Sequence, residues 1–283
     1  MRERLTIRVV KADGSTEEFQ PRKILRTMRS AGASDEAAKK VLKEIEGVAY
    51  DGITTREILK RVKALLRKEE LHTAMRYDLK GAMMRMGPAG FAFETFISEI
   101  LSNYGYKTKL RSILQGKCVQ HEIDVIAERT SGAAIRCLIE CKYHNMAGLS
   151  VELKDVLYTY ARFLDLNEGS EIGKGERFDE VWLVSNTHPS PDAAKYASCR
   201  GMKLLCWGCP RGRGLEEMIA EKKLYPVTIL RSVDRMTLNN LFLADLMLAK
   251  DLVTHDMNYL KEKTKLSEEK LRKLVFEAKQ LMS

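Results

Sequence analysis

Residues 121–144, HEIDVIAERTSGAAIRCLIECKYH, form the stretch that decides the fold of the central part of the chain. Apolar residues alternate with charged ones on both sides of a short turn, TSGAA, and this pattern predicts an antiparallel β-hairpin. The expected strands span 121–128 and 135–143. Charged side chains are rare inside such strands unless another group compensates them. Asp124, Glu140 and Lys142 are therefore candidates for a functional site.

The spacing of these residues predicts a metal site. Side chains alternate between the two faces of a strand, so Glu140 and Lys142 share one face and Cys141 points to the other. The hairpin brings Asp124 towards Glu140, and two carboxylates can hold a hard cation such as Mg²⁺ or Mn²⁺ through oxygen. Lys142 would orient or deprotonate an attacking water, or stabilise charge at phosphorus. The alternative is a surface salt bridge on an edge strand.

The segments around the hairpin predict an α/β domain with a mixed sheet. An amphipathic helix precedes it, a helix with apolar residues three and four apart follows it, and a polar, glycine-bearing loop comes next. A strand, a helix and a further strand complete the pattern. The expected ranges are helix 91–105, strand 107–114, helix 150–166, loop 167–180, strand 181–186, helix 191–201 and strand 202–207.

This arrangement resembles the PD-(D/E)xK nucleases, which carry an acid, a spacer and then E-x-K on the next strand. The similarity to their Mrr-like restriction endonuclease branch covers roughly residues 88–220. In that branch a glutamate in the first helix supports the metal site, and the corresponding residue here is Glu94 in GFAFETFISEIL. The resemblance implies a Mg²⁺-dependent endodeoxyribonuclease. Its catalytic residues would be Asp124, Glu140, Lys142 and Glu94, with Asp124 and Glu140 as the metal ligands.

Two positions depart from that family. His121 and Glu122 stand where many relatives have a glycine before the aspartate, which makes a further metal or water contact conceivable. Relatives also often carry a glutamine in the helix after E-x-K, whereas this helix offers Lys154, Tyr158 and Tyr160.

The first 90 residues hold most of the positive charge. They contain 20 Lys and Arg against 13 Asp and Glu, which is seven of the net nine positive charges of the chain. A β-hairpin, with strands at 5–10 and 16–20 around ADG, precedes the helices of this region. In the third helix, Thr54 and Glu57 have capping-box spacing. The four expected helices span about 21–32, 34–50, 55–69 and 71–86.

Residues 3–88 resemble the ATP-cone, the small nucleotide-sensing domain of ribonucleotide reductases and their repressors, in VVKADGSTEEFQPRKILRTMRSAG and YDGITTREI. In the family, the positions that line the ATP or dATP pocket correspond here to Val9, Lys11, Glu17, Lys23, Ile24 and Thr55. Ala12 departs from the family, since many cones carry a second basic residue there. Backbone N–H groups at helix N-termini can bind phosphates, and the lysines can neutralise them. The alternative is that the lysines are only solvated.

The remaining motifs are less specific. The tail, 219–283, is helical and resembles a helix-hairpin-helix module in LSEEKLRKLVFEA, although the usual glycine is replaced by Lys263-Thr264-Lys265. Cys206 and Cys209 have zinc-type spacing, but a closed site needs four ligands and His188 would have to contribute, so buried structural cysteines are favoured. We expect His144, Arg211 and Arg213 to be ordinary surface residues. The alternative is contact with DNA, since Arg211 and Arg213 lie in the glycine-rich loop PRGRG, which suits contact with backbone phosphates.

Composition narrows the function class. With 45% hydrophobic and 31% charged residues, six scattered cysteines and no long apolar run, the sequence predicts a cytoplasmic protein without a membrane span or disulfide framework. We expect three domains, at 1–88, 89–218 and 219–283, in a homo-oligomeric, ATP- or dATP-regulated DNA endonuclease. The alternative is a non-catalytic, nucleotide-switched DNA-binding regulator with a silent nuclease fold; cleavage of RNA or branched DNA is a third interpretation.

Overall fold

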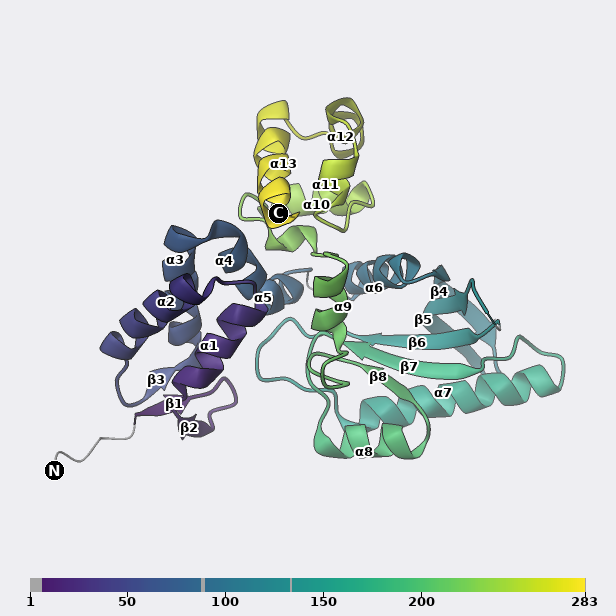
Figure 1. Ribbon diagram of the computed structural model, residues 1–283. Coiled ribbons are helices and arrows are strands. Elements are labelled where there is room, and N and C mark those ends of the chain that lie inside the picture. Colours follow the sequence, from purple (N-terminus) through teal and green to yellow (C-terminus); the bar gives the residue numbers. More distant parts are fainter. Residues whose placement is uncertain (1–6, 88–89, 133, 283) are drawn as a thin grey trace. The chain divides into compact units, whose positions relative to one another are not determined.

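The computed structural model describes residues 7–87, 90–132 and 134–282 (Figure 1). It confirms the predicted fold class, a multi-domain α/β protein with a helical C-terminal part. The chain separates into two compact units. Unit 1 comprises residues 1–82, 227–240 and 249–283, and unit 2 comprises 83–226 and 241–248. The predicted boundary at GPAG includes residues 88–89, which lie outside the described residues, as do residues 5–6 of the first predicted strand.

Unit 1 begins with the predicted β-hairpin, and a third short strand lies parallel to its first strand. The strands are β1 (Arg8–Val10), β2 (Thr16–Glu18) and β3 (Ile53–Thr54). Three helices follow in the expected order: α1 (Pro21–Ser30), α2 (Asp35–Val48) and α3 (Thr55–Glu69). The capping box predicted at the start of α3 is present, with Thr54 and Glu57 each accepting the other's backbone N–H. Val9, Met28 and Val62 belong to the buried core of these elements.

The prediction of one continuous helix at 71–86 is wrong. This segment consists of α4 (Leu71–Tyr77) and α5 (Leu79–Met84), which are separated at Asp78. The backbone N–H of Asp78 donates to the carbonyl of Met75, and its carboxylate accepts from Lys63 of α3 at 2.8 Å. The residue at the break therefore connects this segment to α3 through the ion pair between Asp78 and Lys63.

The C-terminal helices are α10 (Arg235–Leu243), α11 (Asp251–Thr254), α12 (Met257–Thr264) and α13 (Glu268–Met282), preceded by a 3₁₀ turn, η1 (Val227–Ile229). The last three of these helices belong to the same unit as the hairpin domain, whereas α10 is divided between the two units after Asn240. Nη2 of Arg76 in α4 donates to the carbonyl of Leu281 in α13 at 2.8 Å. Lys265 between α12 and α13 has φ +56°, a left-handed conformation that usually favours glycine.

Unit 2 is built on a five-stranded sheet in the order β4-β5-β6-β7-β8. The strands are β4 (Tyr106–Gln115), β5 (Gln120–Arg129), β6 (Arg136–Lys142), β7 (Glu180–Ser185) and β8 (Lys203–Leu205). The first three are antiparallel neighbours, and β6, β7 and β8 run parallel. The mixed sheet is therefore confirmed.

Helices cover both faces of this sheet (Figure 1). They are α6 (Phe91–Asn103), α7 (Leu153–Glu171) and α8 (Pro191–Cys199), and a further helix, α9 (Leu215–Glu221), follows β8 in the chain. On the side of α7 and α8, the core contains Leu138 and Leu183 from the strands and Val156 and Leu166 from α7. Such apolar burial contributes about 25 cal/mol per Å² removed from water.

Helix α7 extends to residue 171, so the predicted loop at 167–180 is wrong over its first five residues. Asn167 explains the extension, because its side chain bonds both the N–H and the carbonyl of Phe178 and thereby folds the following segment back on the helix. Gly169 lies directly against the backbone of Gly116 in the β4–β5 turn. Within the described residues, no helix has both the length and the apolar content needed to cross a bilayer.

Candidate functional site

Asp124 in the middle of β5 and Glu140 near the end of β6 lie on neighbouring antiparallel strands. The register pairs Val125 with Ile139, so one further step along both strands would set Asp124 opposite Glu140. Oδ2 of Asp124 accepts a hydrogen bond from the backbone N–H of Cys141 at 2.7 Å. The two acids predicted from the sequence are therefore brought to one place.

The surroundings of this pair penalise negative charge. Burial, and after it the charge of Asp124, raise the pKa of Glu140 to about 7, although Arg162 and Lys142 act in the opposite direction. Burial also raises the pKa of Asp124, while the Cys141 N–H lowers it. The negative charge of both carboxylates is thus only partly compensated, which is the condition that a bound cation relieves.

Lys142 and Glu140 both face α7, as the sequence predicts for residues two apart on a strand. Nζ of Lys142 lies 3.0 Å from Oδ1 of Asp155, and Oε2 of Glu140 is bonded by Nη1 of Arg162 at 2.5 Å. Asp155 and Arg162 are both residues of α7. The E-x-K pair therefore meets two polar partners on one helix.

Arg162 is the residue that the sequence analysis missed. It is 8% exposed, and its guanidinium lies 5.2 Å from the ring centroid of Tyr158. The positions considered earlier behave differently: Lys154 and Tyr158 are exposed, while Tyr160 packs against the core. Asp155 and Arg162 are seven residues apart, which places them on the same face of a helix, and this spacing was the available signal.

Glu94 approaches the pair from α6. It is 8% exposed, and burial raises its pKa, with a further contribution from the charge of Asp124. Nη1 of Arg111 donates to Oε2 of Glu94 at 3.2 Å and offsets part of this effect. Glu94 is thus electrostatically connected to Asp124, and its support of a metal site stays a prediction.

The backbone of Arg111 is unusual at this point of the sheet. Leu110 pairs with Val125 and Ser112 with Ile123, so Arg111 occupies the position across from Asp124. Its φ is +46°, which non-glycine residues rarely adopt. No sequence signal indicated this conformation, which accompanies the contact between Arg111 and Glu94.

The donor set fits a divalent cation in its chemistry. Among the described residues, no hydrogen bond reaches Oδ1 of Asp124 or Oε1 of Glu140. Carboxylate oxygens are the ligands that Mg²⁺ and Mn²⁺ prefer. Asp124 and Glu140 would hold the ion, and Arg162 would share or release Oε2 of Glu140. Within the same part of the chain, no three or more His, Cys, Asp or Glu side chains are grouped to hold a metal.

Two other residues from the sequence analysis have structural partners near this end of the sheet. Nε2 of His121 lies 2.8 Å from Oδ2 of Asp165 in α7. Nδ1 of His144 lies 2.8 Å from Oγ1 of Thr187, and Asn186 both accepts from the N–H of His144 and donates to its carbonyl. The imidazoles therefore help to fix strand ends against neighbouring segments.

The predicted cysteine pair closes a small loop. Cys206 is buried and Cys209 half-buried, and their backbones exchange hydrogen bonds of 2.7 and 3.1 Å. His188 lies against Gly208 between them. No cluster of metal-binding side chains includes these residues within the described chain.

In unit 1, two of the predicted nucleotide-binding residues, Lys11 and Lys23, contact the carboxylate of a third, Glu17. Nζ of Lys11 and Nζ of Lys23 lie 3.1 and 2.8 Å from Oε2 of Glu17. The Lys23 hydrogen bond is the largest effect that lowers the pKa of Glu17. An incoming phosphate would compete with Glu17 for both ammonium groups.

The other three predicted residues lie on the hairpin, α1 and α3. Val9 pairs with Glu17 across the hairpin and is buried, and Ile24 on α1 belongs to the same core. Thr55 is the first residue of α3, where the helix N-terminus presents free N–H groups. The hairpin, α1 and α3 therefore contribute to one small region.

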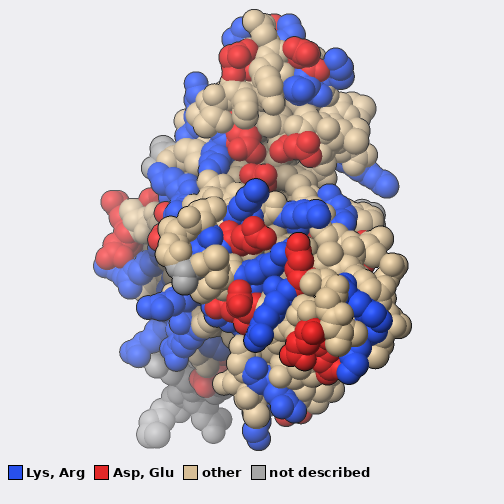
Figure 2. Space-filling model, turned by 90° about the vertical axis from the view of Figure 1, so that its right-hand side faces the viewer, with Lys and Arg blue, Asp and Glu red and all other residues tan. Residues whose placement is uncertain are grey.

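Surface charges of both signs are interspersed on the face that Figure 2 shows. Residues 91–215 contain 16 Lys and Arg against 15 Asp and Glu. A polyanion would therefore be held on unit 2 by local groups rather than by the overall charge.

Two family models match the chain. Residues 7–79 match the ATP cone domain, and residues 225–282 match the family described as AF1548-like, C-terminal. An uncharacterized protein of Archaeoglobus fulgidus is 40% identical over 186 residues, which are 66% of this chain and 99% of that protein. The chain belongs to the AF1548-like family.

Solved structures extend the comparison. The crystal structure of AF1548, a protein of unknown function, has 38% identity and a TM-score of 0.59, and the match covers 69% of this chain and 98% of that one. The MspJI restriction endonuclease bound to a 27-mer oligonucleotide matches with 14% identity and a TM-score of 0.32, over 47% of this chain and 29% of that one. A similarity that low does not establish a shared fold.

The ATP cone at 7–79 supports nucleotide binding by this AF1548-like protein. Neither the Archaeoglobus fulgidus relative nor the AF1548 structure carries a named activity. The side chains of unit 2 are therefore the observations that bear on its function.

Proposed function

We propose that this AF1548-like protein is a metal-dependent DNA endonuclease of the PD-(D/E)xK type whose activity responds to ATP or dATP. One observation carries the proposal: Asp124 and Glu140 are largely buried side by side, with Lys142 on the same face as Glu140. Buried carboxylates of raised pKa with a specific charged partner are typical of functional sites.

Each side chain has a defined part in hydrolysis. Asp124 and Glu140 would hold a Mg²⁺ or Mn²⁺ ion, which when bound supplies charge neutralisation at the phosphate and a more acidic water. Lys142 would orient that water or stabilise charge on the phosphate, and Asp155 holds the ammonium group at 3.0 Å. Glu94 would support the acidic site from α6, balanced by Arg111.

Arg162 has to move or share its partner when the site is filled. It bonds Oε2 of Glu140, so an incoming cation would meet a positive charge. Burial makes the loss of a charged partner costly for the one that remains. Arg162 would then act as a counter-charge that keeps Glu140 ionised until a cation is bound.

Nucleotide binding to the ATP cone would regulate this chemistry. The triphosphate would take Lys11 and Lys23 from Glu17, with Thr55 at the N-terminus of α3. Regulation requires that nucleotide bind the active and inactive arrangements with different affinities. In cone proteins this commonly acts between copies of the chain, so a homo-oligomer is part of the proposal.

The experiment is a cleavage assay on plasmid and linear DNA with Mg²⁺ or Mn²⁺, in the presence and absence of ATP or dATP. We expect the wild type to nick DNA, Asp124→Asn and Lys142→Ala to lose cleavage, and Lys107→Ala, on the exposed side of β4, to retain it. Cleavage by Asp124→Asn at the wild-type rate would refute the proposed site.

A second candidate is a non-catalytic, nucleotide-switched DNA-binding regulator. The ion pair between Arg162 and Glu140 favours it, because a permanently occupied Glu140 cannot hold a metal. In that case the wild type, Asp124→Asn and Lys142→Ala would bind DNA alike, and none would cut RNA, branched DNA or duplex DNA.

A further inference from the structure

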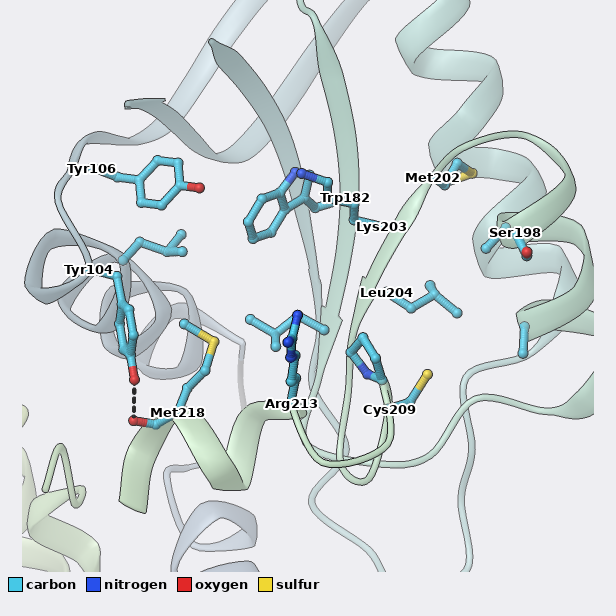
Figure 3. A pocket seen from close by; sticks show the side chains of 15 residues that line it. Tyr104, Tyr106, Trp182, Ser198, Met202, Lys203, Leu204, Cys209, Arg213 and Met218 are labelled. Atoms are coloured by element: carbon cyan, nitrogen blue, oxygen red, sulfur yellow. Dashed lines mark hydrogen bonds between the residues drawn. The ribbon is translucent and has the colours of Figure 1, made fainter. Parts of the chain in front are cut away.

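A second candidate binding site lies in unit 2, around the edge strand β8 (Figure 3). It is a pocket of about 700 Å³, called the edge pocket here, whose walls come from α6, α8, α9, the strands β4, β7 and β8, and the loop that follows β8. The aromatic and cationic side chains that line it are Tyr104, Tyr106, Trp182, Lys203 and Arg213. Neither the carboxylates nor Lys142 of the proposed nuclease site line it.

Three aromatic side chains surround one part of the edge pocket. Tyr106 and Trp182 point towards each other, with ring centroids 6.0 Å apart and ring planes at 78°. The indole N–H of Trp182 donates to Glu180 at 2.8 Å, and the hydroxyl of Tyr104 donates to the carbonyl of Met218 at 3.0 Å. Because these bonds fix the indole and the Tyr104 ring, a flat ligand would meet pre-arranged surfaces.

A cation extends into the same space. Arg213 is exposed, and Figure 3 shows its side chain rising from the loop towards Trp182. Among the described residues, no carboxylate pairs with its guanidinium. Lys203 also lies over the Trp182 ring at 5.0 Å, but Glu180 holds its ammonium at 2.7 Å. Arg213 is therefore the cation available to an anionic ligand.

We propose that the edge pocket binds one nucleotide unit, with the base against the aromatic side chains and the phosphate on Arg213. A purely apolar ligand would use the rings but not the guanidinium, whereas a nucleotide joins a flat aromatic base to an anion. Aromatic stacking combined with a cationic contact is how proteins hold unpaired bases, and the volume lies in the usual range for small-ligand sites. This site goes beyond the proposed nuclease function and needs no metal.

The test uses Trp182 as a fluorescent reporter. The chain has two tryptophans, so Trp207→Phe leaves Trp182 alone. The protein is titrated in EDTA with thymidine monophosphate and, separately, with a short single-stranded oligothymidylate. We expect the ligand to quench Trp182, Arg213→Ala to weaken binding about tenfold, and the salt dependence of oligonucleotide binding to fall by about one unit of slope.

Arg211→Ala is the matched control, since Arg211 is exposed on the same loop but does not line the edge pocket. Its binding should stay within about twofold of the wild type. Both loop variants are also compared with both tryptophans present, so the test stands if Trp207→Phe does not fold.

Quenching by the monophosphate assigns the site to free nucleotides, and quenching by the oligonucleotide alone assigns it to an unpaired base of a strand. Either result supports the proposal. Absence of quenching by both ligands, or equal losses in Arg213→Ala and Arg211→Ala, would overturn it. Since no cleavage is measured, the outcome is independent of the nuclease proposal.

Discussion

Arg162 supplies the positive charge that pairs with Glu140 at the proposed nuclease site. It is buried, it bonds Glu140, and its Nε has no hydrogen-bond partner among the described residues. Its guanidinium therefore depends on Glu140 for charge compensation. Removing one member of such a pair leaves the other as a buried, uncompensated charge.

Replacing Arg162 by leucine should reveal this dependence. We expect Arg162→Leu to lower the free energy of unfolding by about 3 kcal/mol, because a buried Glu140 is left without its partner. Lys273→Ala, which breaks an exposed pair with Glu269 on α13, should change it by less than about 0.5 kcal/mol. Urea denaturation in EDTA measures both, and equal effects would show that the Arg162 pair is no stronger than a surface contact.

The spacing of residues in the sequence predicted which acids meet but not which cations compensate their charge. The two-residue period of a strand placed Glu140 and Lys142 on one face, and their partners on α7 agree with that. Arg162 escaped notice because it lies in a helix rather than beside the E-x-K motif. The positive φ of Arg111 followed from no pattern in the chain.

Elements were predicted well where a local signal marks their ends. The capping box at Thr54 and Glu57 fixed the start of α3, and the polar turn fixed the β5–β6 hairpin. The end of α7 and the break at Asp78 were missed, because long-range bonds from Asn167 and Lys63 decide them. Local sequence does not report such contacts.

Helix α7 carries both partners of the E-x-K motif, and its packing on the β4–β5 turn depends on Gly169. A Cβ there would lie 2.8 Å from backbone atoms of Gly116 and Lys117. We expect Gly169→Ala to destabilise unit 2 by about 1–3 kcal/mol, because backbone cannot move aside cheaply.

Gly47 in α2 provides the control, since no heavy atom lies within 4 Å of a Cβ built there. Gly47→Ala should stabilise its helix by about 0.5–1 kcal/mol. Denaturation followed by far-UV circular dichroism measures both variants. A neutral Gly169→Ala would mean that α7 sits less tightly against the turn than the structure indicates.

A proposed nucleotide site in unit 1 would regulate a proposed hydrolytic site in unit 2. The excess positive charge lies in the first 90 residues, where seven of the net nine charges occur. The excess positive charge that would attract phosphates thus lies in the region of the ATP cone, while residues 91–215 have nearly equal numbers of positive and negative charges. The predicted division into three domains stays a prediction.

Lys23→Ala tests the nucleotide site. Loss of the ammonium group should weaken ATP or dATP binding about tenfold, which is about 1.4 kcal/mol, and should remove most of the nucleotide effect on cleavage. Lys39→Ala, exposed on α2, should bind within about twofold of the wild type in calorimetry. Equal affinities of the two variants would place the nucleotide elsewhere.

The most direct test of the account is calorimetric binding of Mn²⁺ to the whole chain without DNA or nucleotide. We predict one ion per chain for the wild type, no detectable binding for Asp124→Asn, and wild-type binding for Glu128→Gln, an exposed acid farther along β5. Binding to Asp124→Asn as tight as to the wild type, or no binding to any variant, would contradict the claim that Asp124 and Glu140 form a metal site.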